Sequence, residues 1–104
     1  MTLHRLMDET FNGLVLGNTK PVLVTFTSDW CGPCKELEST LEKLAEDKKD
    51  KAEFVLADMD KCSFASSQYG IRSLPTVMVF RDGKEVSRIE GVQTREKLLE
   101  MLGV

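Results

Sequence analysis

The stretch Trp30-Cys31-Gly32-Pro33-Cys34-Lys35 stands between a strand-like run, Pro21 to Thr27, and a helix-like run, Lys35 to Lys49. Two thiols at this spacing can close a small disulfide and open it again. The position between a strand and a helix aims a helix N-terminus at Cys31, where the partial positive charge stabilises a thiolate. Because the thiolate is the reactive form of cysteine, the motif predicts thiol chemistry at Cys31 and Cys34.

Length and composition predict one soluble domain over residues 1–104. The chain is 41% hydrophobic and 30% charged, which is ordinary for a globular protein. The net charge is -3 and the basic residues are scattered among acidic ones, so no nucleic-acid partner is expected. No run approaches the roughly 20 apolar residues of a membrane helix, so no membrane partner is expected either.

The cysteine count favours a reducing compartment. Two of the three cysteines form the CxxC, and the segment Met1 to Asp8 has no apolar core, so no signal peptide is expected. These features predict a cytoplasmic protein with a dithiol that cycles. The alternative is half of a zinc site, but zinc needs four ligands and only Cys62 and His4 remain to complete it. We therefore expect no metal, with Cys62 as a small core residue and His4 on the surface.

Periodicity predicts an alternation of strands and helices. The central strand is Val22 to Thr27, which is apolar on both faces apart from its threonines. Asp82-Gly83 between alternating segments indicates a hairpin turn, and Thr94 is the expected N-cap of the last helix. Strands are expected at 3–6, 22–27, 53–58, 76–80 and 85–89, and helices at 8–16 (with Phe11, Leu14 and Val15 on one side), 35–49, 63–69 and 94–102.

This order, carrying the motif at 30–35, resembles the thioredoxin family along nearly the whole chain. Ile71 to Thr76 resembles the family's loop before a cis-proline, Phe80 to Gly83 its hairpin, and Gly91-Val92 its glycine segment on the substrate side. The resemblance implies an α/β thioredoxin fold, a central mixed sheet of four to five strands flanked by helices on both faces. It also implies that Pro75 is cis.

The resemblance assigns chemical roles to the motif. Cys31 attacks a substrate disulfide, and the more buried Cys34 resolves the mixed disulfide, leaving the two cysteines oxidised. Gly32 allows close backbone approach, and Pro33 suits an early helix position and restrains the dithiol. Lys35 completes the active-site support together with Pro75. The expected substrate-binding rim comprises Trp30, Met59, Ser73, Leu74, Pro75, Gly91 and Val92.

The function implied is that of a protein-disulfide reductase, an electron carrier acting on disulfide-containing proteins. By resemblance it is recharged by a thioredoxin reductase, which draws electrons from NADPH through a flavin, so no cofactor binds this chain itself. A monomer is expected. Two alternatives stay open: a binding or holding module of the same fold, and a specialised redox paralogue with an altered reduction potential. An oxidase or isomerase is a third possibility, against which the Gly-Pro spacer argues.

Two positions depart from the family pattern. Thr25 stands where thioredoxins usually carry a buried Asp, and Leu56 stands where a Lys often lies near it. A more stable scaffold with a less assisted resolving step is therefore expected, because a buried carboxylate is costly unless well paired. Cys34 then loses its proton to water or to an acid such as Asp58. Ser39 replaces the family's kinking proline, which predicts a straighter helix.

Overall fold

Strand β2 (Val22–Thr27) lies at the centre of the sheet because all of its side chains are apolar or small and all are buried. The computed structural model describes residues 3–104, so Met1 and Thr2, which begin the segment considered as a leader, lie outside the described residues. The five strands stand in the order β1-β3-β2-β4-β5. The others are β1 (Leu3–Leu6), β3 (Glu53–Asp58), β4 (Thr76–Arg81) and β5 (Lys84–Glu90).

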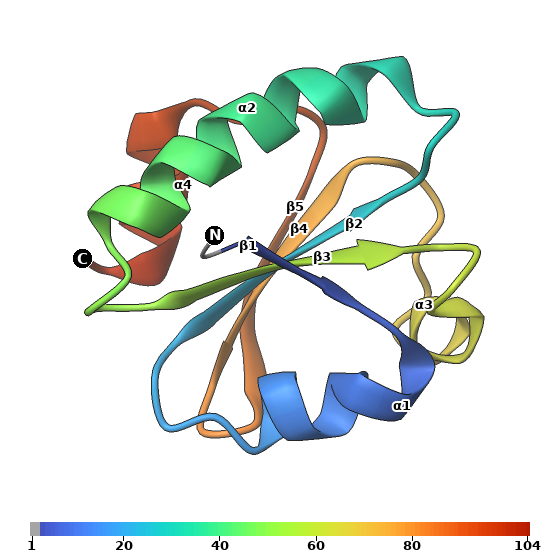
Figure 1. The fold of residues 1–104 in the computed structure, drawn as a ribbon, viewed down its shortest axis with the longest axis horizontal. Coiled ribbons are helices and arrows are strands. Elements are labelled where there is room, and N and C mark those ends of the chain that lie inside the picture. The colour runs from blue at the N-terminus through green and yellow to red at the C-terminus, as the bar shows by residue number, and fades with distance from the viewer. Residues whose placement is uncertain (1–2) are drawn as a thin grey trace.

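The sheet is mixed, as the resemblance implies. β3 pairs in parallel with both β1 and β2, whereas β4 pairs antiparallel with β2 and with β5. Helices α2 (Gly32–Asp47) and α4 (Arg95–Leu102) cover one face, and α1 (Asp8–Phe11) and α3 (Ser63–Gln68) cover the other (Figure 1). The predicted α/β thioredoxin fold is confirmed. Among residues 3–104, no helix combines the length and the apolar character that crossing a bilayer requires.

Each face of the sheet has its own apolar core. Helices α2 and α4 bury leucines against alternate strand residues, and α1 and α3 pack on the side chains that point the other way. The first core includes Leu23, Leu37, Leu41, Leu44, Phe54, Leu56, Val77, Leu98 and Leu102. The second includes Leu6, Phe11, Val15, Val24, Phe26, Cys62, Met78 and Phe80.

Helix α2 begins earlier than predicted. It starts at Gly32 rather than at Lys35, because Pro33 fits the first turn, where its missing N–H has no intrahelical partner to lose. It ends at Asp47, two residues before the predicted end at Lys49. The helix runs without interruption through Ser39.

The first helical segment also differs from its prediction. After α1 the chain continues as the π-helical turn η1 (Asn12–Leu16), whose wider spacing rotates the side chains relative to an α-helix. Phe11 and Val15 are buried, but Leu14 is 40% exposed. Leu14, expected on the same side of the helix as Phe11 and Val15, is therefore not buried with them.

The hairpin and the last helix follow their sequence signals. Asp82 and Gly83 have φ values of 52° and 78°, the left-handed backbone that a tight hairpin turn requires. A side chain at Gly83 would come within 2.9 Å of the Leu16 carbonyl oxygen, so this turn also needs the absence of a Cβ. Thr94 caps α4 as predicted, since its side chain accepts a hydrogen bond from the Lys97 amide at 3.1 Å.

Candidate active site

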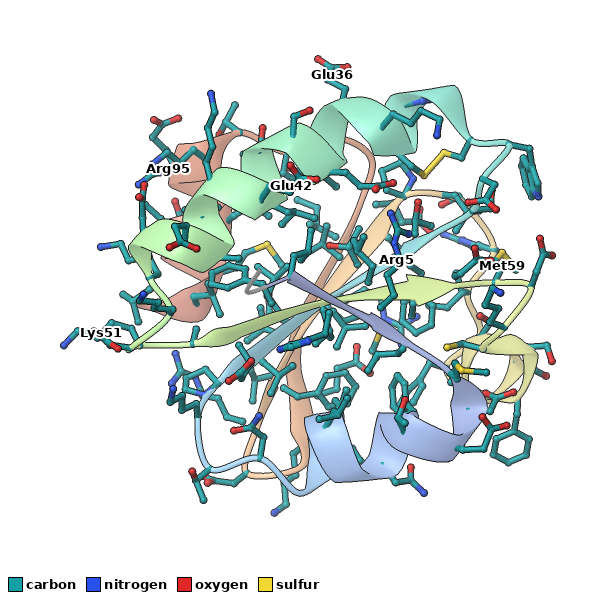
Figure 2. All side chains as sticks on the ribbon, viewed as in Figure 1. Arg5, Glu36, Glu42, Lys51, Met59 and Arg95 are labelled. Carbon is teal, nitrogen blue, oxygen red and sulfur yellow. A yellow bond between two sulfur atoms is a disulfide. The ribbon has the colours of Figure 1, made fainter. Side chains whose placement is uncertain are left out.

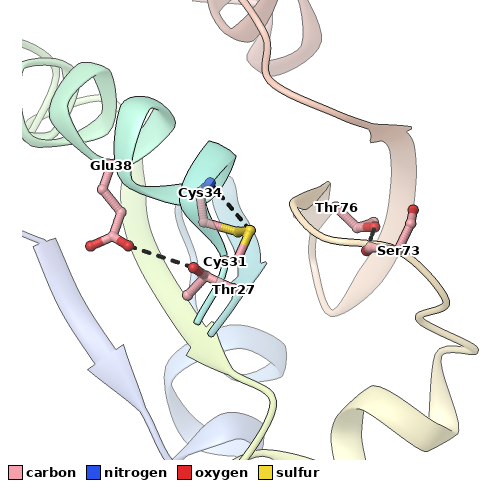
Figure 3. Close-up of a disulfide and its surroundings, with 6 residues drawn as sticks. All are labelled: Thr27, Cys31, Cys34, Glu38, Ser73 and Thr76. Carbon is pink, nitrogen blue, oxygen red and sulfur yellow. Dashed lines mark hydrogen bonds between the residues drawn. A yellow bond between two sulfur atoms is a disulfide. The ribbon is translucent and has the colours of Figure 1, made fainter. Parts of the chain in front are cut away.

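Cys31 and Cys34 form a disulfide at the start of α2. Their Cα atoms are 5.4 Å apart, and Cys31 is the N-cap residue of the helix. The Cys31 Sγ accepts a hydrogen bond from the Cys34 amide at 3.2 Å (Figure 3). The first sulfur thus lies where free N–H groups and the positive end of the helix dipole converge, which favours a thiolate after reduction.

The two cysteines differ in burial less than predicted. Cys34 is fully buried, as expected, but Cys31 is only 6% exposed. The sulfur of Cys31 is turned toward the helix and bonded to Cys34 in this oxidised form, which leaves it little open surface. Lys35 and Pro33 are exposed beside the pair.

The loop before β4 holds a cis-proline. The Leu74–Pro75 peptide bond is cis, which confirms the prediction for Pro75. The Thr76 hydroxyl donates to the Ser73 carbonyl at 2.6 Å and closes the loop (Figure 3). The Gly91 amide donates to the Pro75 carbonyl at 2.8 Å, so the predicted glycine segment is tied directly to this loop.

A groove of about 530 Å³ opens beside the disulfide. It brings together two segments that are far apart in the sequence, the motif and the loop before β4. Trp30 stands at its edge with 72% of its surface exposed, so it is a rim residue rather than a core residue. The groove is lined by Trp30, Cys31, Gly32, Pro33, Met59, Arg72, Ser73 and Leu74.

Three expected members of the rim do not line this groove. Pro75 is a buried member of the loop, and Gly91 and Val92 lie outside the lining. Conversely, Arg72 lines the groove and pairs with Glu90 at 3.1 Å, and the prediction did not include it. Arg72 directly precedes Ser73 and Leu74 in the sequence, and this position could have identified it as a groove residue.

The two positions that depart from the family pattern are neighbours on adjacent strands. Thr25 on β2 is in register with Leu56 on β3, and both are buried on the face covered by α2. Among the described residues, the Thr25 hydroxyl has no hydrogen-bond partner. Asp58, the acid named as an alternative proton acceptor, is 6% exposed, and its Oδ1 accepts from the Asp60 amide at 2.8 Å.

Cys62 lies away from the disulfide and is fully buried. Its Sγ donates to the Leu6 carbonyl at 3.3 Å. Burial, followed by the negative charges of Asp8, Asp58 and Glu9, raises the pKa of Cys62 from 9.0 to about 11. These contacts fit the predicted core role. Within residues 3–104, no three potential metal-binding side chains gather in one place, and His4 is exposed.

We expect native Cys62 to resist alkylation. In the reduced protein at pH 8, iodoacetamide should modify Cys31 first and Cys62 about a hundredfold more slowly, since Cys62 is buried and mostly protonated. Intact-mass and peptide analysis would measure both rates, with a denatured sample as the control in which all cysteines react. Equal rates for Cys62 and Cys31 in the native protein would contradict the structure.

The same pKa shift predicts a stability change at alkaline pH. The folded state holds the Cys62 proton more tightly than the unfolded chain, so this stabilisation is complete below pH 9.0 and is lost as the pH rises toward about 11. In thermal unfolding experiments, the Cys62→Ala variant should lose less stability than the parent protein as the pH rises from 9.0 to about 11. An identical pH dependence in the variant would show that Cys62 does not contribute.

Comparison with known proteins identifies relatives for nearly the whole chain. The family model described as Thioredoxin matches residues 2–103. A thioredoxin of Griffithsia pacifica is 39% identical, over 98% of this chain and 94% of the relative. The chloroplastic M-type thioredoxin of Chlamydomonas reinhardtii is 42% identical, over 88% of this chain and 71% of the relative. A thioredoxin of Rickettsia conorii is 34% identical, over 95% and 94%.

Proposed function

Because this chain belongs to the thioredoxin family and is a thiol–disulfide oxidoreductase, we propose that it reduces disulfides of other proteins in the cytoplasm through Cys31 and Cys34. The observation that carries the proposal is the disulfide at the N-terminus of α2, placed beside an open groove. This arrangement places three features together: a reducible disulfide, a helix N-terminus that favours the thiolate, and a groove that can receive a polypeptide.

The reaction consists of two thiol–disulfide exchanges. The Cys31 thiolate attacks one sulfur of the substrate disulfide, forms a new S–S bond and releases the first substrate thiolate. The Cys34 thiolate then attacks the Cys31 sulfur and releases the second. The substrate gains two electrons, and the Cys31–Cys34 disulfide of the structure is the product. The helix N-terminus favours the first step because it stabilises the Cys31 thiolate.

The groove supplies the surface for a substrate segment. Trp30 and Met59 give it an apolar edge, and Leu74 is placed to offer its backbone groups from the loop on the other side, where the Ser73 carbonyl is already bonded to Thr76. An extended chain carrying a disulfide could use such groups for main-chain hydrogen bonds. A small apolar surface of this kind suits transient contact with many proteins, where tight specificity is not needed.

The return to the dithiol requires an external reductant. By family membership, this is a thioredoxin reductase that passes electrons from NADPH through its flavin, while this chain carries electrons only in its cysteines. We propose that the chain works as a monomer. The cytoplasmic placement is supported by Cys62, a buried free thiol in a protein whose other cysteines form the redox pair.

Reduction of insulin tests the proposed activity. With dithiothreitol, or with a thioredoxin reductase and NADPH, micromolar protein should accelerate insulin precipitation well above the rate with reductant alone. A Cys31→Ser/Cys34→Ser double variant is the control and should give only the background rate. Wild-type protein that is no faster than this control would overturn the proposal.

A binding module of the same fold is the second candidate, favoured by the 72% exposure of Trp30 at the groove edge. The same double variant separates the two functions. A binding module would retain its partner and its cellular effect without the cysteines, whereas a reductase would lose the effect completely.

A further inference from the structure

A polar contact beneath the start of α2 joins the Glu38 carboxylate to Thr27, which ends the strand leading into the redox motif. Glu38 lies four residues after Cys34, so both side chains are on the same side of the helix. The Oε2 of Glu38 accepts from the Thr27 hydroxyl at 3.5 Å, and its Oε1 accepts from the Arg5 guanidinium at 3.0 Å. Figure 3 shows Thr27 lying between Glu38 and the disulfide.

The sheet explains why these groups meet. Arg5 on β1 is in register with Leu56 of β3, which belongs to the core under α2, so alternation places Arg5 on the same face. Thr27 ends β2 and is in register with Asp58 of β3. Thr27 is 1% exposed and the Glu38 side chain 16% exposed, so the carboxylate reaches inward from the surface.

The resolving step needs a proton acceptor. Cys34 is fully buried, and its thiol must lose a proton before the sulfur can attack Cys31. Thr25, beneath the helix, cannot act as a base, and the described hydrogen bond of the Asp58 carboxylate is to the Asp60 amide rather than to a side chain of β2. The Glu38 carboxylate is the acid that accepts a hydrogen bond from the hydroxyl of Thr27, the last residue of β2 before the motif.

We propose that Glu38 accepts the proton of Cys34 through the hydroxyl of Thr27 during resolution, an assignment that rests on the proposed function. As the proton leaves, the Cys34 sulfur forms a bond to the Cys31 sulfur. The bond between Cys31 and the substrate sulfur breaks, and the substrate leaves as a thiolate with the bonding electron pair. The proton on Glu38 then passes to solvent or to the released thiolate, so atoms and electrons balance.

Several charged groups surround this carboxylate. Arg5 faces it from β1, Asp58 lies at the neighbouring register position on β3, and Lys35 and Glu42 lie one helical turn to either side on α2. Helix α4 contributes Arg95, which pairs with Asp47 at the far end of α2. The Arg5 side chain is 60% exposed, so its main effect is to orient Glu38 rather than to add much stability.

Release of a coloured thiol separates the two chemical steps. Reduced protein mixed with excess aromatic disulfide dye should release one thiolate in a first phase, from attack by Cys31, and a second in a later phase, from attack by Cys34. In Glu38→Gln, we expect the second phase at pH 7 to be slower by about tenfold, which is less than the roughly hundredfold or more of a general base in direct contact, because a hydroxyl intervenes. The first phase should stay within about twofold, and the defect should disappear near pH 9, where hydroxide replaces the lost base.

Matched variants distinguish proton transfer from charge and from structure. Glu36→Gln removes the same charge from an exposed position that points away from the sheet (Figure 2), and it should leave both phases unchanged. Thr27→Val should slow the second phase as Glu38→Gln does. Thr27→Ser, which keeps the hydroxyl, should release the second thiolate at the rate of the parent protein. Combining Thr27→Val with Glu38→Gln should add no further loss, since both break one path.

Two results would overturn the assignment. One is an unchanged second phase in both Glu38→Gln and Thr27→Val. The other is a faster second phase in Glu38→Gln with its half-maximal rate at lower pH, which would mean that the carboxylate acts only as a repelling charge. Failure of the wild-type protein to release any thiol would instead overturn the proposed function, and this inference with it.

Discussion

A Cys34→Ser variant will accumulate a covalent complex with a disulfide substrate, whereas a Cys31→Ser variant will form almost none. The reason lies in the order of the two exchanges. In the proposed mechanism, Cys31, at the helix N-terminus and beside the groove, makes the first bond to the substrate. Without Cys34, the protein has no second thiolate at the site to attack the Cys31 sulfur, so the mixed disulfide persists.

Non-reducing electrophoresis and intact mass after incubation with insulin measure this trapping. Turnover should fall to the uncatalysed background in both variants, while only Cys34→Ser carries a covalently bound insulin chain. Cys62→Ala is the matched control and should retain full turnover, because Cys62 is buried away from the disulfide. Equal trapping by Cys31→Ser, or loss of turnover in Cys62→Ala, would contradict the assigned roles.

Replacing Thr25 by Asp will strongly destabilise the folded protein at neutral pH. Thr25 is fully buried opposite Leu56, and no cation is in register with it on the neighbouring strands. An unpaired carboxylate there should lower the free energy of unfolding at pH 7 by about 3 kcal/mol or more. Burial raises the pKa of such an Asp, so the penalty is absent at acid pH and grows as the pH rises above the unfolded pKa near 4.

Urea unfolding between pH 3 and pH 8 measures this penalty. Thr25→Val is the control of equal shape and should be neutral or stabilising by about 1 kcal/mol, because it removes a hydroxyl without a described partner. A Thr25→Asp variant as stable as the parent at every pH would mean that the site is more polar or more hydrated than the packing indicates.

The same variant also tests the chemistry of resolution. An acid at position 25 places a base under the helix that holds Cys34, so Thr25→Asp should gain insulin-reduction rate in the pH range where it remains folded. It should also restore the second phase to the Glu38→Gln protein, since the new carboxylate replaces the lost acceptor. No gain at any pH would argue against proton transfer as a limit on this enzyme.

Features governed by local chemistry were predictable from the sequence. The Asp82-Gly83 turn and the Thr94 cap each depend on one or two residues with a specific backbone or side-chain preference. The central position of β2 follows from a run that is apolar on both faces. The cis state of Pro75 required the family resemblance, because the residues themselves also fit an ordinary loop.

Features that depend on distant contacts were not predictable. Arg5 and Glu38 are 33 residues apart and meet only because β1 forms a sheet edge under α2. Arg72 reaches the groove because the loop before β4 folds against the motif. Leu14 was misplaced because the π-helical turn η1 changes the spacing that a regular helix would have.

The reduction potential of the Cys31–Cys34 pair tests the central claim most directly. The protein would be equilibrated with glutathione and dithiothreitol buffers, its thiols trapped, and the oxidised fraction determined by mass. A general disulfide reductant should have a potential clearly below that of the glutathione couple, so that it stays reduced in the presence of glutathione and passes electrons to substrates. A potential equal to or above that of glutathione would contradict this account and indicate oxidation, isomerisation or a dedicated partner instead.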